Sequence, residues 1–148
     1  MVKIDEKEYE ELRRHGEETY PHESCGVLLG CGEGDERVVV RIARCENVRV
    51  DSLRDRYRID GRELVRIASA ARERGEDIVG FYHSHPDHPA RWSQTDLAEA
   101  HWPGCSYLIT RIASGRREET NSFVLEGTGE VDKRFREEEI QVTHGNRS

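Results

Sequence analysis

The sequence is poor in apolar residues and contains no long apolar run. Apolar residues make up 34% of the chain, against about 45–50% in typical globular domains when glycine is included. No segment approaches the roughly 18–20 consecutive apolar residues of a membrane-spanning helix. Residues 1–16 also lack the apolar core of a signal peptide. We therefore expect a protein that is not embedded in a membrane and that resides in the cytoplasm.

Lysine is scarce as well, since only Lys3, Lys7 and Lys133 occur and the other basic residues are arginine. The formal net charge is −7. Binding to a nucleic-acid backbone depends on basic side chains that neutralise phosphates, so we expect no nucleic-acid partner. The abundance of arginine and glutamate is compatible with ion-pair networks and equally with codon bias.

Four cysteines are present, but none form a C-x-x-C pair, which makes a four-thiolate zinc site improbable. Without a secretion signal, disulfides are also disfavoured. We expect buried free thiols that behave as small hydrophobic groups. The cysteines are Cys25, Cys31, Cys45 and Cys105.

The 148 residues have the length of one domain, which we assign to residues 1–148 with a frayed tail after about residue 143. Capping residues and helical spacing predict three helices, whereas short apolar or alternating runs predict strands. The expected fold class is therefore α/β, with one mixed β-sheet flanked by about three helices. The helices are expected at 5–19, 60–75 and 93–101, and the strands at 25–31, 37–43, 56–59, 78–83, 107–112, 122–125 and 135–142.

Two histidines separated by one residue are the first candidates for chemistry. His83 and His85 end an expected strand, and because side chains alternate along a strand, both imidazoles point to the same face. Asp96, in the first turn of the next expected helix, can fold back toward them. Two histidines and one carboxylate are ligands for zinc or another divalent metal, and they leave a position for water, as catalytic sites do.

Hydrolysis also needs a group that accepts and returns a proton. Glu23 precedes the first apolar strand and serves this role if that strand neighbours the one with His83. Ser93 offers a hydroxyl to the oxyanion that forms when water attacks a carbonyl. Ser93 and Asp96 also match a helix-capping pattern, and one serine can do both.

Glu23, the sequence His83-Ser-His85 and, after seven intervening residues, Ser93-Gln-Thr-Asp96 resemble the signature of the JAMM (MPN-plus) metalloproteases. The stretch from Glu23 to Gly30 and the Gly-Phe-Tyr lead-in to His83 resemble small stand-alone prokaryotic members. The resemblance covers roughly residues 5–126. It implies a cytidine-deaminase-like JAMM domain.

The resemblance also implies a function. His83, His85 and Asp96 would bind Zn²⁺, Glu23 would be the general acid/base and Ser93 would support the oxyanion. The enzyme would hydrolyse a peptide or isopeptide bond after the C-terminal Gly-Gly tail of a ubiquitin-like or sulfur-carrier protein. A dimer is possible, and the sequence gives neither the carrier nor the leaving group.

Two other functions are compatible with such a fold. A non-catalytic MPN-type interaction scaffold is the alternative, although scaffolds characteristically lack some metal ligands. A nucleobase deaminase would need a His-x-Glu sequence together with a Pro-Cys-x-x-Cys sequence, and the second of these is absent.

The surroundings of the motif allow further expectations. Alternation along the strand is expected to turn Cys25 away from the metal, whereas His88 could line the cleft. Trp92 and Trp102 are expected to be packing anchors. A flexible substrate tail would lie along a sheet edge beside the metal, with residues 46–58 as one wall.

Overall fold

The computed structural model describes residues 1–33, 35–49, 57–127 and 129–144. They form one eight-stranded mixed sheet, in the order β7-β6-β5-β4-β2-β3-β1-β8, and three helices, so the predicted fold class is confirmed. The helices are α1 (Glu6–Thr19), α2 (Gly61–Glu73) and α3 (Gln94–Glu99). The strands are β1 (Val2–Asp5), β2 (Cys25–Glu33), β3 (Glu36–Cys45), β4 (Asp77–Pro86), β5 (Ser106–Ala113), β6 (Arg116–Glu126), β7 (Arg134–Glu138) and β8 (Ile140–Thr143).

The helices begin where the sequence predicts. Asp5 caps α1 by accepting a hydrogen bond from the backbone N–H of Lys7, and Asp60 caps α2 in the same way. Each cap satisfies one of the backbone donors that a helix start leaves unpaired. None of the helices in the described ranges is long and apolar enough to cross a membrane.

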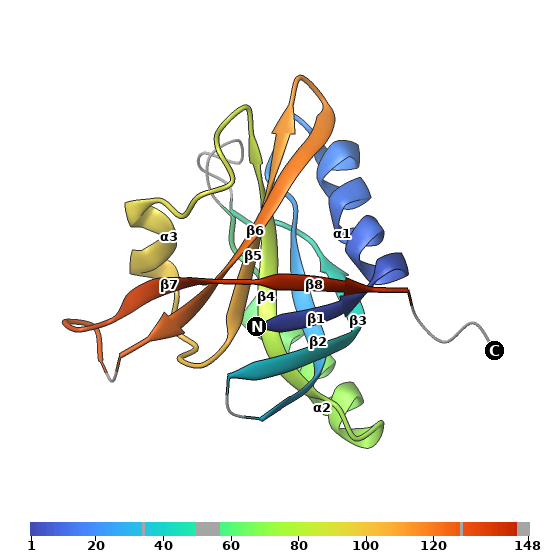
Figure 1. The fold of residues 1–148 in the computed structure, drawn as a ribbon, viewed down its shortest axis with the longest axis vertical. Coiled ribbons are helices and arrows are strands. Elements are labelled where there is room, and N and C mark those ends of the chain that lie inside the picture. The colour runs from blue at the N-terminus through green and yellow to red at the C-terminus, as the bar shows by residue number, and fades with distance from the viewer. Residues whose placement is uncertain (34, 50–56, 128, 145–148) are drawn as a thin grey trace.

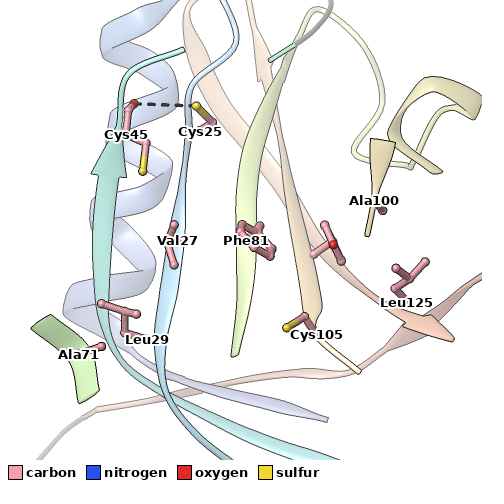
Figure 2. Packing of buried hydrophobic residues seen from close by; sticks show 10 residues of the cluster. Cys25, Val27, Leu29, Cys45, Ala71, Phe81, Ala100, Cys105 and Leu125 are labelled. Atoms are coloured by element: carbon pink, nitrogen blue, oxygen red, sulfur yellow. Dashed lines mark hydrogen bonds between the residues drawn. The ribbon is translucent and has the colours of Figure 1, made fainter. Parts of the chain in front are cut away.

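The sheet is covered on both faces. Alternate residues along its strands point to opposite sides and pack into separate hydrophobic clusters. On one face, α1 contributes Leu12 to a cluster with Leu28 of β2. On the other face, α2 and the region of α3 cover a cluster that includes Val27 and Phe81. Figure 2 shows this second cluster with α1 behind the sheet. The layers explain why β2 reads as a continuous apolar run.

The structure differs from the expected secondary structure at β1 and at residues 57–59, and a third expectation lies mostly outside the described residues. Strand β1 was not expected, because its four residues are too few to show an alternating pattern. Residues 57–59 form no strand, and Arg56, the first residue of that expected strand, lies outside the described residues. The expected tail after residue 143 falls mostly on 145–148, which also lie outside the described residues.

The last expected strand, 135–142, is two strands that lie at opposite edges of the sheet. β7 pairs with β6, whereas β8 pairs with β1, and only Glu139 separates them. Figure 1 shows β7 and β8 as a nearly continuous run that crosses the molecule. One short segment therefore forms both edges of the curled sheet.

Candidate metal centre

The site is built on β4, which is an interior strand. β4 pairs with β2 on one side and with β5 on the other. Its residues alternate between the two faces, so Tyr82 and Ser84 point toward α1 while Phe81, His83 and His85 point toward the opposite face. β4 pairs with β5 from Gly80 to Pro86 and with β2 from Asp77 to His83, and the expected position of a substrate tail along a sheet edge stays a prediction.

His83, His85 and Asp96 converge, and their ligand atoms all lie within 4.8 Å of one another. These three residues are termed the metal cluster. The Nε2 atoms of His83 and His85 are 3.2 Å apart. Asp96 places Oδ1 3.3 Å from His83 Nε2 and Oδ2 3.1 Å from His85 Nε2. A tetrahedral zinc ion with bonds of roughly 2.0–2.1 Å sets its ligands about 3.3 Å apart. The three side chains therefore have the spacing of a zinc ligand set.

The electrostatics favour forms of these groups that bind a cation. Burial lowers the pKa of His83 and so keeps its imidazole neutral, with a lone pair available. Burial alone would raise the pKa of Asp96, but electrostatic interaction and hydrogen bonding with His83 and His85 outweigh burial and lower it. A neutral imidazole at His83 and an ionised carboxylate at Asp96 are the states that a metal requires.

Each histidine ring is oriented by a different contact. The Nδ1 atom of His85 lies 2.8 Å from the carbonyl oxygen of Pro89, which directs Nε2 toward the cluster. The buried Nδ1 atom of His83 has no hydrogen-bond partner among the described residues. Its ring instead stacks on Tyr57, with centroids 4.5 Å apart and planes at 25°. Nothing in the sequence pattern indicated Tyr57.

Asp96 reaches the histidines because of the way α3 begins. Ser93 is the N-cap of α3, and its Oγ accepts a hydrogen bond from the backbone N–H of Asp96 at 3.0 Å. In return, Ser93 N–H donates to Asp96 Oδ2 at 2.8 Å. This reciprocal capping box fixes the carboxylate. Lys133 donates to the carbonyls of Ala98 and Ala100, which holds the other end of α3.

Glu23 is almost fully buried, with 3% of its surface exposed, just before β2. Cys25 is paired with His83 in the sheet register, and Ser24 and Ser84 exchange hydrogen bonds beyond that pair. Because side chains alternate, Glu23 shares the face of His83 and His85. Burial first, and then neighbours that include Asp96 and Glu23, raise the pKa of Tyr57, which is consistent with both carboxylates lying on the Tyr57 side of the sheet.

The close pairing of β2 and β4 depends on Gly26. A Cβ atom there would lie 2.1 Å from the ring of Tyr82, so only glycine allows the tyrosine to lie flat across β2. The expectation for Cys25 is wrong, since it shares the face of His83. Burial raises the pKa of its thiol well above the usual range, and a neutral thiol is a poor nucleophile.

The remaining cysteines and aromatic residues follow the expectations in part. All four cysteines are free, but Cys31 is exposed whereas the other three are buried. Figure 2 shows the Cys25 thiol directed at the carbonyl oxygen of Cys45. Trp92 packs against Phe135 as a packing anchor. His88 is exposed on the loop after β4.

A pocket of about 460 Å³ adjoins the metal cluster. Tyr57 contributes to it and also stacks on His83, so the pocket and the cluster share a wall. Trp102, which we expected to be a packing anchor, lines the pocket and is 40% exposed. Arg49 pairs with Glu99 at 2.6 Å across the pocket rim. Residues 49 and 57–59 thus form one wall, whereas residues 50–56 of the expected wall lie outside the described residues.

Comparison with known proteins gives a consistent result. Residues 5–126 match the family described as prokaryotic homologs of the JAB domain. The chain is 30% identical over 128 residues to the CysO-cysteine peptidase of Mycobacterium tuberculosis, covering 86% of this chain and 82% of that protein. It is 44% identical over 89 residues to the desampylase of Haloferax volcanii, covering 60% of this chain but only 62% of the desampylase. The solution structure of a Desulfitobacterium hafniense protein superposes with a TM-score of 0.83 at 31% identity, covering 99% of this chain and 96% of that one.

Proposed function

The chain belongs to the family of prokaryotic JAB-domain homologs, and from that premise we propose that it is a zinc-dependent peptidase or isopeptidase of the JAMM type. The observation that carries the proposal is the convergence of His83, His85 and Asp96 at the spacing of zinc ligands. These three residues would hold the ion. Zinc in such a site supplies Lewis acidity and makes a water molecule acidic enough to attack at neutral pH.

The other residues of the motif would move protons and bind the developing charge. Glu23 takes a proton from the attacking water and gives it to the leaving amine as the C–N bond breaks. Its burial supports this role, as does its position two residues before Cys25, which pairs with His83. Ser93 Oγ accepts its capping hydrogen bond and still carries a proton, so it can donate to the oxyanion while it caps α3.

The substrate would be a conjugate of a ubiquitin-like or sulfur-carrier protein, cut after a C-terminal Gly-Gly tail. The names of the CysO-cysteine peptidase and the desampylase support this class. The tail would approach the metal cluster through the pocket beside Tyr57, whose ring stacks on His83. The four free cysteines are consistent with a cytoplasmic location.

The test uses the zinc-loaded protein and carrier proteins of the same genome, each linked through its tail to cysteine or to a lysine side chain. Cleavage is followed by mass spectrometry. We expect Glu23→Gln to bind zinc but lose cleavage, and His83→Ala to lose zinc. Glu8→Gln, the same change at a half-buried glutamate of α1, is the control and should cleave normally.

Two outcomes would contradict the proposal. Full cleavage by Glu23→Gln would remove Glu23 from its role. A wild-type protein that folds without binding metal and leaves every conjugate intact would favour an interaction scaffold instead.

A further inference from the structure

The side-chain amide of Asn47 joins three backbone segments around the metal cluster. Its Nδ2 group donates to the carbonyl oxygen of Glu23 at 3.3 Å. Its Oδ1 atom accepts from the backbone N–H of Arg49 at 3.1 Å and from that of Arg58 at 3.0 Å. The donor and the acceptor of one amide therefore serve different parts of the chain.

The Oδ1 atom of Asn47 fixes the backbone of residues that form one wall of the pocket. Arg58 follows Tyr57, whose ring stacks on His83. A backbone hydrogen bond from Val48 N–H to the Arg58 carbonyl, 2.9 Å long, adds to the same connection. Since the Nδ1 atom of His83 has no hydrogen-bond partner among the described residues, the placement of Tyr57 is what orients this histidine.

The donor end of Asn47 holds Glu23. The peptide group between Glu23 and Ser24 has its carbonyl bonded to Asn47, while its N–H donates to Ser84 Oγ at 2.8 Å. Ser84 lies between the two histidines of β4. The backbone of Glu23 is therefore fixed from two sides, by the strand that carries the histidines and by the segment that carries Tyr57.

We propose that Asn47 is a positioning residue for the peptidase reaction. Its amide fixes the backbone at Glu23 and next to Tyr57 relative to the metal cluster, and it does not touch the reacting atoms. This proposal rests on the proposed function. Asparagine suits the position because its amide combines a two-proton donor with an acceptor that has two lone pairs. Aspartate would keep the acceptor and lose the donor, whereas alanine would lose both.

The test compares Asn47→Ala and Asn47→Asp with wild type, and its first measurement needs no substrate. Amide hydrogen exchange, followed by NMR, reports the N–H groups of Arg49 and Arg58. We expect Asn47→Ala to expose both amides to exchange and Asn47→Asp to keep them protected. Wild-type protection in Asn47→Ala would overturn the proposal whether or not the protein proves to be a peptidase.

The second measurement separates positioning from general stability. For Asn47→Ala we expect kcat to fall about 10- to 100-fold, as for other residues that orient a metal site from outside it, with a smaller change in KM. Asn47→Asp should keep the amide protection but not recover kcat, because its carboxylate cannot donate to the Glu23 carbonyl. Wild-type kcat in either variant would overturn the proposal.

Asp5→Ala provides the matched control. Asp5 also bonds a backbone N–H through its side chain, at the start of α1 and away from the cluster. Its loss should lower the temperature of thermal unfolding, as the loss of a helix cap does, and leave kcat unchanged. An equal fall in kcat for Asp5→Ala would mean that stability alone explains the effect at Asn47.

Discussion

At the scale of single residues, Asp96 combines two tasks in one carboxylate. Oδ2 accepts the N–H of Ser93 and also faces His85 Nε2, while Oδ1 faces His83. The start of α3 and the candidate metal ligands are therefore parts of the same structure. The two readings of Ser93-x-x-Asp96, helix cap and active-site element, are compatible, and the structure shows the cap directly.

The motif residues could be predicted because their relations are local in sequence. The spacing of His83 and His85 needs only strand alternation, and Asp96 needs only one turn of the following helix. Tyr57 and Asn47 could not be predicted, since their contacts with His83 and Glu23 cross long stretches of chain without a periodic pattern. The prediction that Cys25 points away from the metal was wrong. Cys25 follows Glu23 by two residues, and this spacing already predicts that both side chains lie on the same face of the sheet.

His15 makes the stability of the fold dependent on pH. It lies on the buried side of α1, with Nδ1 2.7 Å from the hydroxyl oxygen of Tyr82. Burial, aided by the charge of Arg44 and opposed by Glu18 and Glu11, lowers the pKa of His15 to about 4. The unfolded chain has a value of about 6.5, so between these two pH values the unfolded state binds a proton that the folded state excludes.

We therefore expect the free energy of unfolding to fall as the pH falls from about 6.5 toward 4, by at most about 3 kcal/mol from this residue. Urea denaturation at several pH values measures it. The variant His15→Gln can still bond Tyr82 and should lack this part of the pH dependence. If the free energy of unfolding changed with pH equally in wild type and variant, His15 would not be the source of this pH dependence.

At the scale of elements, the alternation of apolar residues in segment 135–142 predicts where a strand ends but not which strands it pairs with. The apolar residue Phe135 has an odd residue number, whereas the apolar residues Ile140 and Val142 have even ones. This change of phase in the alternation marks the break at Glu139. It signals that one strand ends and another begins. It does not signal that β7 and β8 lie at opposite edges of the sheet, because pairing partners far away in the chain decide that.

A buried ion pair links these elements inside the curled sheet. Glu138 of β7 accepts hydrogen bonds from Arg37 of β3 at 2.8 Å and from Ser122 of β6 at 2.7 Å. Its pKa is lowered, because the hydrogen bonds from Ser106, Ser122 and Arg37 outweigh the opposing effect of burial. The carboxylate is therefore charged, and it also lies 3.1 Å from the N-terminal ammonium group of Met1. Loss of the Glu138 charge would leave the buried Arg37 guanidinium without this carboxylate, whereas loss of Arg37 would leave Glu138 paired with the ammonium group.

We expect Glu138→Gln to lower the free energy of unfolding by about 3–5 kcal/mol, Arg37→Met to lower it by less because the Met1 ammonium group still pairs with Glu138, and the double variant to lose less than the sum. Urea denaturation of the four proteins gives the coupling. The exposed pair Arg136–Glu126, at 2.6 Å on the neighbouring strands, is the control, and Arg136→Met should cost less than about 1 kcal/mol. Additive losses at the buried pair would contradict a direct interaction.

At the scale of the whole molecule, a metal that binds the folded state only must stabilise it by mass action. We expect zinc at about 100 times its dissociation constant to add about 2.7 kcal/mol to the free energy of unfolding. Thermal unfolding with zinc and with a chelator measures the effect. His83→Ala should unfold at the same temperature in both, and a wild type insensitive to zinc would contradict the ligand set.

The arrangement of β7 and β8 also bears on the addition of strands from other molecules at the sheet edges. The two outermost strands are five and four residues long, and β7 carries several charges, features that discourage intermolecular strand addition. Both come from one segment, so a slip or cut near Glu139 would uncover β6 and β1 together. Damage there would create two templates for aggregation in a single event, and loss of solubility would precede any loss of chemistry.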